Sequence, residues 1–265
     1  MKDKNILLAA KLLFNHRLNK TGLKDLPADL KPSDIEESYL IQNELKILYL
    51  TLKDNYCIGK KVGCTNKHAQ DQVNVFEPFY GNLFSKFSDK SSCKLKSSKF
   101  FNPYIEPEVS VRLKKDININ DYPFKFENSK DLFDLIFASI ELVDFRFGEN
   151  IKDVGINNLI ISNGASEYYI KGANTFNIDE IDFGNQNVDL IINEKIVDQG
   201  NTNLVLKHPL NSAIWVVNKL AENGEPMLKG QYITTGTCTK AIKAEKNSFI
   251  RADFGNLGIV EFEYI

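Results

Sequence analysis

Cysteine and histidine are scarce in this sequence of 265 residues, and their scarcity argues against several kinds of site. The four cysteines form no C-x-x-C pair, and no histidine stands at zinc-ligand spacing from any of them, so neither a zinc finger nor a disulfide framework is expected. We expect reduced thiols in a cytoplasmic protein. The three histidines, His16, His68 and His208, are too scattered along the chain to predict a metal site.

An excess of charge of one sign and long apolar runs are also missing. The net charge is −2, from 33 basic and 35 acidic residues, and no basic stripe with interleaved aromatics is present, so no nucleic-acid partner is predicted. No apolar run is long enough to span a membrane, and Lys11 interrupts the first apolar stretch, which favours an amphipathic helix over a signal peptide. Motifs for phosphate loops, dinucleotides, serine hydrolases and zinc proteases are absent.

The pattern of elements changes near residue 90. Residues 1–90 predict a helical N-terminal part, in which Ser33 and Glu36 have capping-box spacing and "EPFYGNLF" reads as a turn-bearing loop. The Ser- and Lys-rich segment 85–99 reads as a solvated linker, and residues 91–265 predict a β-rich catalytic domain. Because strands do not alternate regularly with helices, we predict an α+β fold, with a rolled or sandwiched sheet and helices around it.

The stretch "IEPEVSVRL", residues 105–113, alternates between two kinds of side chain. The apolar ones fall on one face of a strand, and Glu106 and Glu108 fall on the other. Two interpretations stay open: a solvent-facing strand surface helped by Arg112, or two walls of a metal site. Pro107 donates no backbone hydrogen bond, so it predicts a strand edge or a bulge, and such irregularities often lie near functional sites.

Glu141 stands in "LIFASIELV", a run that is otherwise almost wholly apolar. A buried carboxylate is costly unless it is paired or bound to a metal. A salt bridge to Arg112 or Arg146 is one explanation. The other is a third ligand beside Glu106 and Glu108, since three carboxylates suit Mg²⁺ or Mn²⁺, which can hold a 2-oxo acid and stabilise its enolate.

A proton-transfer group is offered by "KVGCTN". A lysine near a cation or in a dry pocket has a lowered pKa and can move protons near neutrality, which makes Lys61 a candidate. A surface lysine is the plainer interpretation. Lys60 is its neighbour, and periodicity does not decide which of the two points inward.

Several stretches together carry a family resemblance. They are "KVGCTNKHAQ", "EPFYGNLF", "IEPEVSVRLKKDI", "ASIELVDFRF", the long stretch from "GNTNLVLKHPL" to "QYITTGT", and "ADFGNLGIVEF". Through them the chain resembles, nearly end to end, the 2-keto-4-pentenoate hydratase / 4-oxalocrotonate decarboxylase family of the fumarylacetoacetate hydrolase superfamily. The spaced E-x-E with a later "ELVD" is its most specific element.

The resemblance implies a set of roles for individual residues. Glu106, Glu108 and Glu141 match the metal carboxylates of the family, with Mg²⁺ or Mn²⁺ as the cofactor. Lys61, rather than Lys60, matches the catalytic and substrate-binding lysine. Thr235 in "ITTGT" matches a loop beside the substrate. The implied fold is a mixed β roll of the fumarylacetoacetate hydrolase C-terminal type, and the implied assembly is a homo-oligomer.

The resemblance also implies an activity. The leading hypothesis is a hydratase that adds water to a small 2-hydroxydienoate, such as 2-hydroxypenta-2,4-dienoate, in aromatic catabolism. A decarboxylase of a 4-oxalocrotonate-like diacid is the first alternative. A carbon–carbon hydrolase with His16 as its base is a weaker one. A catalytically silent 2-oxo-acid-binding partner of a pathway aldolase or decarboxylase is the last.

Three positions depart from the family pattern. Phe76 and Phe79 stand where many relatives carry Asp, and Ala165 stands where relatives often carry Ser. Glu77 and Ser166 are the nearest residues that offer a replacement. The acids of relatives are thought to handle protons or place water, so these departures leave open whether hydration or decarboxylation is catalysed.

Overall fold

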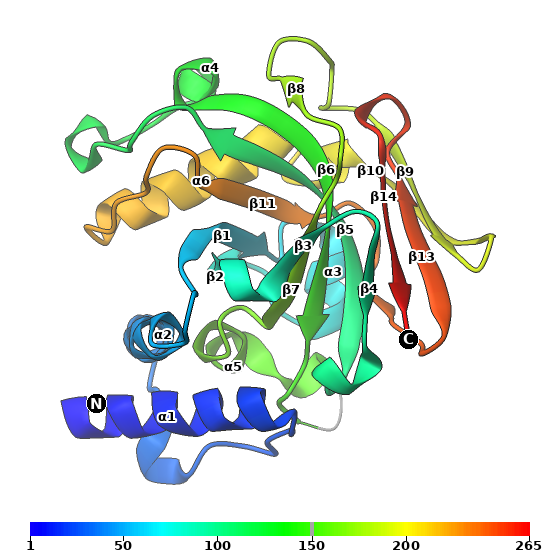
Figure 1. Ribbon diagram of the computed structural model, residues 1–265. Helices are drawn as coiled ribbons and strands as arrows, with labels where there is room; N and C mark the ends of the chain where they lie inside the picture. The colour runs from blue at the N-terminus through cyan, green and yellow to red at the C-terminus, as the bar shows by residue number, and fades with distance from the viewer. Residues whose placement is uncertain (149–150) are drawn as a thin grey trace.

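The computed structural model describes residues 1–148 and 151–265, and this part of the chain folds into two β-sheets with helices around them (Figure 1). The larger sheet has the strand order β2-β1-β11-β5-β6-β7-β3, with β12 pairing to β5 and β8 to β6. The smaller sheet has the order β10-β9-β13-β14-β4. Parallel and antiparallel pairs occur together, so the predicted α+β class with a mixed sheet is confirmed.

The element bounds are as follows. The larger sheet contains β1 (Cys57–Gly63), β2 (Phe79–Phe84), β3 (Ser88–Lys90), β5 (Pro103–Leu113), β6 (Phe133–Asp144), β7 (Ser166–Lys171), β8 (Phe176–Asn177), β11 (Tyr232–Thr237) and β12 (Ile242–Lys243). The smaller sheet contains β4 (Cys93–Leu95), β9 (Asn187–Ile192), β10 (Lys195–Asn201), β13 (Ser248–Asp253) and β14 (Ile259–Tyr264). The α-helices are α1 (Asp3–Asn19), α2 (Ile35–Leu50), α3 (Lys67–Val73), α4 (Ser129–Leu132), α5 (Gly155–Ile161) and α6 (Pro209–Glu222). Short 3₁₀ turns are η1 (Ala28–Leu30), η2 (Ser85–Phe87), η3 (Ser97–Lys99), η4 (Ile119–Asp121), η5 (Phe126–Asn128), η6 (Ile151–Asp153), η7 (Thr202–Leu204) and η8 (Gly255–Leu257).

The helices cover the larger sheet from two sides. α1 and α2 pack together at the bottom of Figure 1, next to α5, and α6 lies along β11 and β1. The cap of α2 is one residue later than predicted, because the Asp34 carboxylate accepts the amide of Glu37 while Glu37 accepts the amide of Ser33. Within the described ranges, no helix is both long and apolar enough to cross a membrane.

Two segments of the N-terminal part differ from the sequence-based expectation. "EPFYGNLF" is not a loop, because Phe79–Phe84 forms the buried strand β2 paired to β1. Gly81 permits this packing, since a Cβ there would lie 2.2 Å from the carbonyl oxygen of Asn163. The segment 85–99 is not a plain linker, because β3 pairs with β7 in one sheet and β4 pairs with β14 in the other. The division near residue 90 stays a prediction.

The strand β5 is central rather than at an edge, so the edge expected at Pro107 is wrong. It pairs with β6 on one side and with β11 and then β12 on the other. The Pro107 carbonyl accepts the Cys238 amide. Because N and C=O of one strand residue point to the same side, the missing N–H faces the junction of β11 and β12. The irregularity lies in β11, where the register shifts between Thr234 and Thr237.

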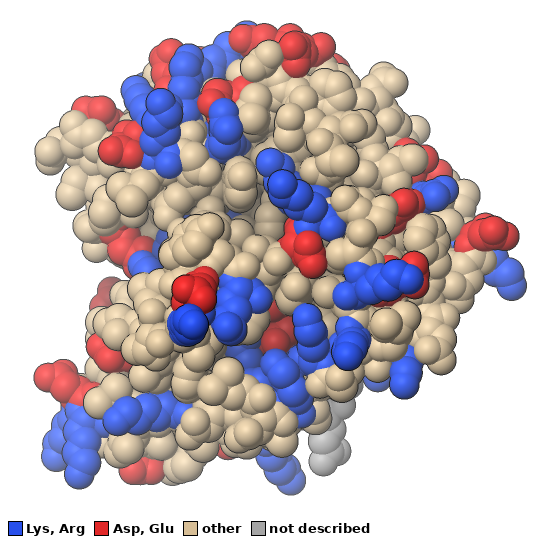
Figure 2. All heavy atoms as spheres, viewed as in Figure 1, with Lys and Arg blue, Asp and Glu red and all other residues tan. Residues whose placement is uncertain are grey.

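Charge is mixed over the surface shown in Figure 2. Lys and Arg side chains are interspersed with Asp and Glu on this face. This agrees with the near-balance of 33 basic and 35 acidic residues in the sequence.

Candidate active site

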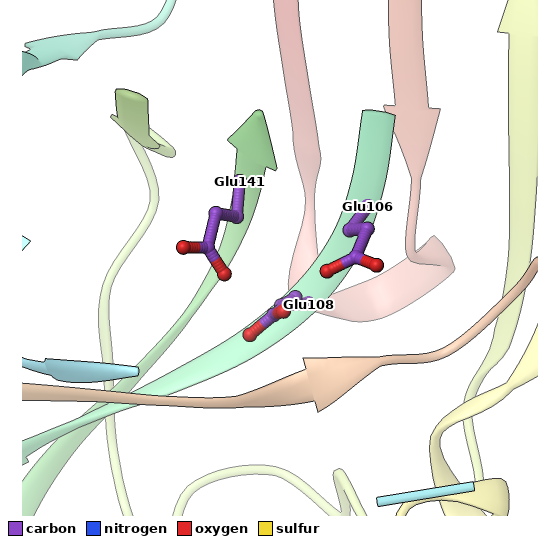
Figure 3. Close-up of side chains that lie close together, drawn as sticks. All are labelled: Glu106, Glu108 and Glu141. Carbon is purple, nitrogen blue, oxygen red and sulfur yellow. The ribbon is translucent and has the colours of Figure 1, made fainter. Parts of the chain in front are cut away.

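Three carboxylates meet on one face of the larger sheet. Glu106 and Glu108 are two residues apart on β5 and therefore share a face, and Glu141 on β6 lies directly opposite Glu106 in the strand register. One oxygen atom from each carboxylate lies within 4.8 Å of the others. Figure 3 shows the three side chains directed toward a common space. Strand pairing between β5 and β6 thus builds this arrangement, which we call the glutamate triad.

The plainer interpretations of these glutamates are wrong. The triad does not face solvent, because Glu106 is only 9% exposed and the other two are fully buried. Neither expected arginine neutralises Glu141. Arg112 pairs with Asp134 at 2.6 Å, and Arg146 pairs with Asp144 at 2.6 Å.

Lys61 is the cation that reaches the triad. Its Nζ lies 3.3 Å from Glu141 Oε2 and donates a hydrogen bond to the carbonyl oxygen of Gly164 at 3.1 Å. Lys60 instead pairs with Glu225 at 2.6 Å, away from the triad. The open choice between the two lysines is therefore resolved by placement, since neighbouring residues of β1 point to opposite faces. The catalytic role of Lys61 stays a prediction.

Burial and like charge govern protonation in the triad. Burial raises the pKa of Glu106 to about 7, against the opposing effect of Lys61. Burial, followed by the charges of Glu141 and Glu106, raises the pKa of Glu108. For Lys61, burial alone would lower the pKa, but the Glu141, Glu106 and Glu108 carboxylates together raise it above its ordinary value. The lowered lysine pKa expected from the sequence is thus wrong, because that expectation left out the carboxylates as neighbours.

The triad fits a divalent cation. When all are ionised, three carboxylates and one ammonium leave a charge of −2, which a divalent ion neutralises. Glu108 Oε1 and both oxygens of Glu141 are buried and accept no hydrogen bond from the described residues. Buried oxygens of this kind are stabilised by a hard cation. That each of the three glutamates is a metal ligand remains a prediction.

A glycine beside the triad was not singled out from the sequence. The Gly236 amide donates to Glu108 Oε2 at 2.9 Å and fixes that carboxylate. Its φ is +105°, and a Cβ there would lie 1.8 Å from Thr65 Oγ1, so only glycine fits. Thr235, the predicted substrate residue, is buried next to it and donates its hydroxyl proton to the Val109 carbonyl at 2.9 Å. The only sequence signal was the glycine in "ITTGT".

A small hollow opens beside Lys61, and we call it the Lys61 hollow. The Phe79 ring forms one wall, with its centre 5.4 Å from Lys61 Nζ. Apolar side chains make up most of the lining: Val73, Phe79, Val143, Phe145, Leu159 and Ala165. Phe76, by contrast, is exposed, and the exposed Glu77 lines a separate hollow with Trp215. Of the two phenylalanine departures, only Phe79 borders the candidate site.

Known proteins resemble this chain along its whole length. It is 27% identical to a 4-oxalocrotonate decarboxylase of Pseudomonas putida, with 100% of this chain and 98% of the relative covered. It is also 27% identical to a 2-oxo-hept-4-ene-1,7-dioate hydratase of Escherichia coli, with 97% of each covered. A 2-keto-4-pentenoate hydratase of Dechloromonas aromatica is 25% identical, with 95% and 94% covered. No protein-family model matches the chain.

Solved structures agree with these relatives. The 4-oxalocrotonate decarboxylase from Pseudomonas putida G7, complexed with magnesium and adipate, superposes with a TM-score of 0.90 at 26% identity, covering 100% of this chain and 99% of that one. The resemblance to the hydratase and decarboxylase family is confirmed. A fumarylpyruvate hydrolase from Pseudomonas aeruginosa shares the fold alone, with a TM-score of 0.61 at 11% identity over 78% of this chain and 88% of that one.

Two other residues considered from the sequence lie outside the Lys61 hollow. Ala165, a departure from the hydratase and decarboxylase family, borders it, but Ser166 lines a different hollow together with Arg17. His16 lines that second hollow as well, and its Nδ1 is hydrogen-bonded to the Thr21 hydroxyl at 2.8 Å. Neither residue is placed to replace a missing acid or base beside Lys61.

Divalent-metal affinity is expected to fall as the pH is lowered through about 7. Two triad carboxyls have raised pKa values, that of Glu106 being about 7, and each must release its proton before it binds an ion. Below that pH, each retained proton weakens binding by about tenfold per pH unit. Calorimetric titration with Mg²⁺ at pH 8 and pH 6 measures the change. Equal affinity at the two pH values would contradict the triad as the binding site.

The same protons give a stability effect of known sign. Without added metal, folded Glu106 holds its proton up to about pH 7, whereas in the unfolded chain it releases it near 4.5. The free energy of unfolding should therefore fall as the pH rises from about 4.5 to about 7. Saturating Mg²⁺ should remove this loss, because the ion compensates the charges that form.

Proposed function

We propose that this protein is a divalent-metal-dependent lyase that adds water to a small 2-hydroxydienoic acid, such as 2-hydroxypenta-2,4-dienoate. The observation that carries the proposal is the buried glutamate triad, with Lys61 as the cation that contacts it. The names of the relatives, which include hydratases for two different 2-oxo acids, support hydration as the reaction. We further propose that it acts in the cytoplasm as a homo-oligomer.

Glu106, Glu108 and Glu141 would hold the metal, as Mg²⁺ or Mn²⁺. When bound there, the ion would stabilise negative charge on the 2-oxygen of the acid. The contribution of the chain is rigidity. The triad stands on two fully paired strands, and the Gly236 amide holds Glu108 in place. Donors and acceptors fixed in this way need little reorganisation during the reaction.

Lys61 would move the proton. Its raised pKa keeps it as a protonated donor beside Glu141. In the proposed reaction the proton of the 2-hydroxyl is lost and a proton is delivered to the terminal carbon, which leaves a 2-oxo acid with a double bond between C3 and C4. Water then adds across that bond, its oxygen joining C4 and its proton joining C3. Lys61 ends in the protonation state in which it began.

Decarboxylation of a 4-oxalocrotonate-like diacid is the second candidate, and the lining of the Lys61 hollow favours it. Phe79 and Ala165 offer an apolar wall where relatives often place acids or hydroxyls. An apolar wall destabilises a carboxylate but accommodates carbon dioxide. The carbon–carbon bond breaks, its electrons pass into the enolate, and Lys61 supplies the proton that the remaining carbon takes up. No positioned water is required.

Turnover measurements separate the candidates. With Mg²⁺ or Mn²⁺, we expect 2-hydroxypenta-2,4-dienoate to lose its diene absorbance as water adds. Release of carbon dioxide from 4-oxalocrotonate, with the dienoate left unchanged, would replace hydration by decarboxylation. Metal-dependent binding of pyruvate without turnover of either acid would instead identify a catalytically silent binding protein.

A further inference from the structure

Two threonine hydroxyls beside the glutamate triad are buried without a hydrogen-bond partner. Thr65 is 2% exposed and Thr234 is fully buried, and neither Oγ1 atom has a partner among the described residues. A buried hydroxyl that makes no hydrogen bond costs free energy, because the bonds it made to water are lost. Such a donor points to something that occupies the space beside it, either a trapped water or a ligand.

Strand register places Thr234 on the face that carries the triad. It pairs with Lys61 on β1 and with Ser110 on β5, so it lies between these two residues. Directly paired residues project from the same face of a sheet. Ser110 follows Glu108 by two positions and shares its face. The hydroxyl of Thr234 therefore belongs to the floor of the candidate site.

Thr65 reaches the same region from the segment after β1. Its hydroxyl lies against Gly236, where an added Cβ would come within 1.8 Å of Oγ1. The amide of the same glycine donates to Glu108. Asn66, not Thr65, caps helix α3 through its side chain, so the Thr65 hydroxyl is not used for capping. One glycine thus separates this free hydroxyl from a triad carboxylate.

We propose that the hydroxyls of Thr65 and Thr234 bind the carboxylate of the 2-oxo acid substrate, an assignment that rests on the proposed function. A carboxylate taken into a buried site needs donors for its oxygens, and hydroxyls supply short, charge-assisted hydrogen bonds. Thr235, the residue expected from the sequence, has given its proton to the Val109 carbonyl. Two free donors therefore flank the bulged part of β11, one on either side of it.

The test replaces each hydroxyl by a methyl group of the same size. Thr65→Val and Thr234→Val are titrated with pyruvate in saturating Mg²⁺, and each is expected to weaken binding by about tenfold to a hundredfold. Their melting temperatures without pyruvate should be equal to the wild type or higher, because no intramolecular hydrogen bond is lost. A merely structural hydroxyl would lower the melting temperature instead. Thr65→Ser and Thr234→Ser keep the donor and should bind pyruvate nearly as the wild type does.

Ser212→Ala is the matched control. The Ser212 hydroxyl is also buried and unpartnered, but it lies on α6. That helix shares an apolar core with Ile233, the neighbour of Thr234 that points to the opposite face of β11. Pyruvate binding should be unchanged in this variant. Thr→Ala versions provide the same comparison should valine prevent folding.

The outcomes separate this assignment from the proposed function. Wild-type binding of pyruvate, with equal binding by both valine variants, would overturn the assignment alone and leave the hydroxyls to trapped water. Absence of metal-dependent pyruvate binding in the wild type would overturn the proposed function and the assignment together.

Discussion

Glu108→Ala is expected to abolish divalent-metal binding and, with it, turnover. The carboxylate of Glu108 is fully buried, its Oε2 is held by the Gly236 amide, and its Oε1 accepts no hydrogen bond from the described residues. No nearby group is placed to replace it, so Mg²⁺ affinity should fall by more than about a hundredfold. Calorimetric titration with Mg²⁺ measures this loss.

A melting experiment gives a second and independent readout for Glu108→Ala. Removing one of three crowded carboxylates relieves repulsion, so without added metal the variant should melt no lower than the wild type. The rise in melting temperature on adding Mg²⁺ should vanish. Glu263→Ala, at a half-exposed residue paired with Lys94 on the smaller sheet, is the control and should keep the rise. Unchanged Mg²⁺ affinity in Glu108→Ala would remove the triad as the metal site.

Lys61→Met is expected to lower kcat by about a hundredfold to ten-thousandfold while metal binding persists. The variant keeps the length of the side chain but removes the ammonium that lies 3.3 Å from Glu141. Without added metal, loss of this partner leaves buried carboxylates uncompensated, and the free energy of unfolding should fall by about 3–5 kcal/mol. Mg²⁺ should restore most of it, since the ion replaces the missing charge.

Lys60→Met is the matched control for this variant. Lys60 is also buried and ion-paired, with Glu225, but it points away from the triad. Its loss should destabilise the protein in a way that Mg²⁺ does not reverse, and kcat should stay near the wild-type value. A Lys61→Met enzyme with wild-type kcat would exclude Lys61 as the proton carrier.

Local patterns predicted the members of the site better than their pairing. The alternation around Glu106 and Glu108 and the isolated Glu141 singled out three carboxylates from the sequence. Their meeting depends on the register between β5 and β6, which sets Glu106 opposite Glu141 across 35 intervening positions. Neither periodicity nor composition encodes that register directly, because it follows from how both strands fit a common core.

The errors share a physical cause. Pro78 and Gly81 read as turn signals, yet burial on both faces made Phe79–Phe84 a strand. Pro107 was read correctly as lacking a donor, but the gap in pairing comes from the end of β11 and not from a sheet edge. In each case the deciding partner lies far away in sequence, where local propensity carries no information.

The placement of β11 has a consequence for how the chain assembles during its synthesis. β11 lies between β1 and β5, yet Tyr232–Thr237 is translated long after both of them. Until residue 237 leaves the ribosome, one side of each of these strands lacks its native neighbour and is open to pairing with other chains. The glutamates exist by then, but Lys61 and Thr65 cannot be set beside them. The nascent chain therefore acquires its metal-binding geometry only near the end of translation, so ion loading follows chain completion rather than guiding it.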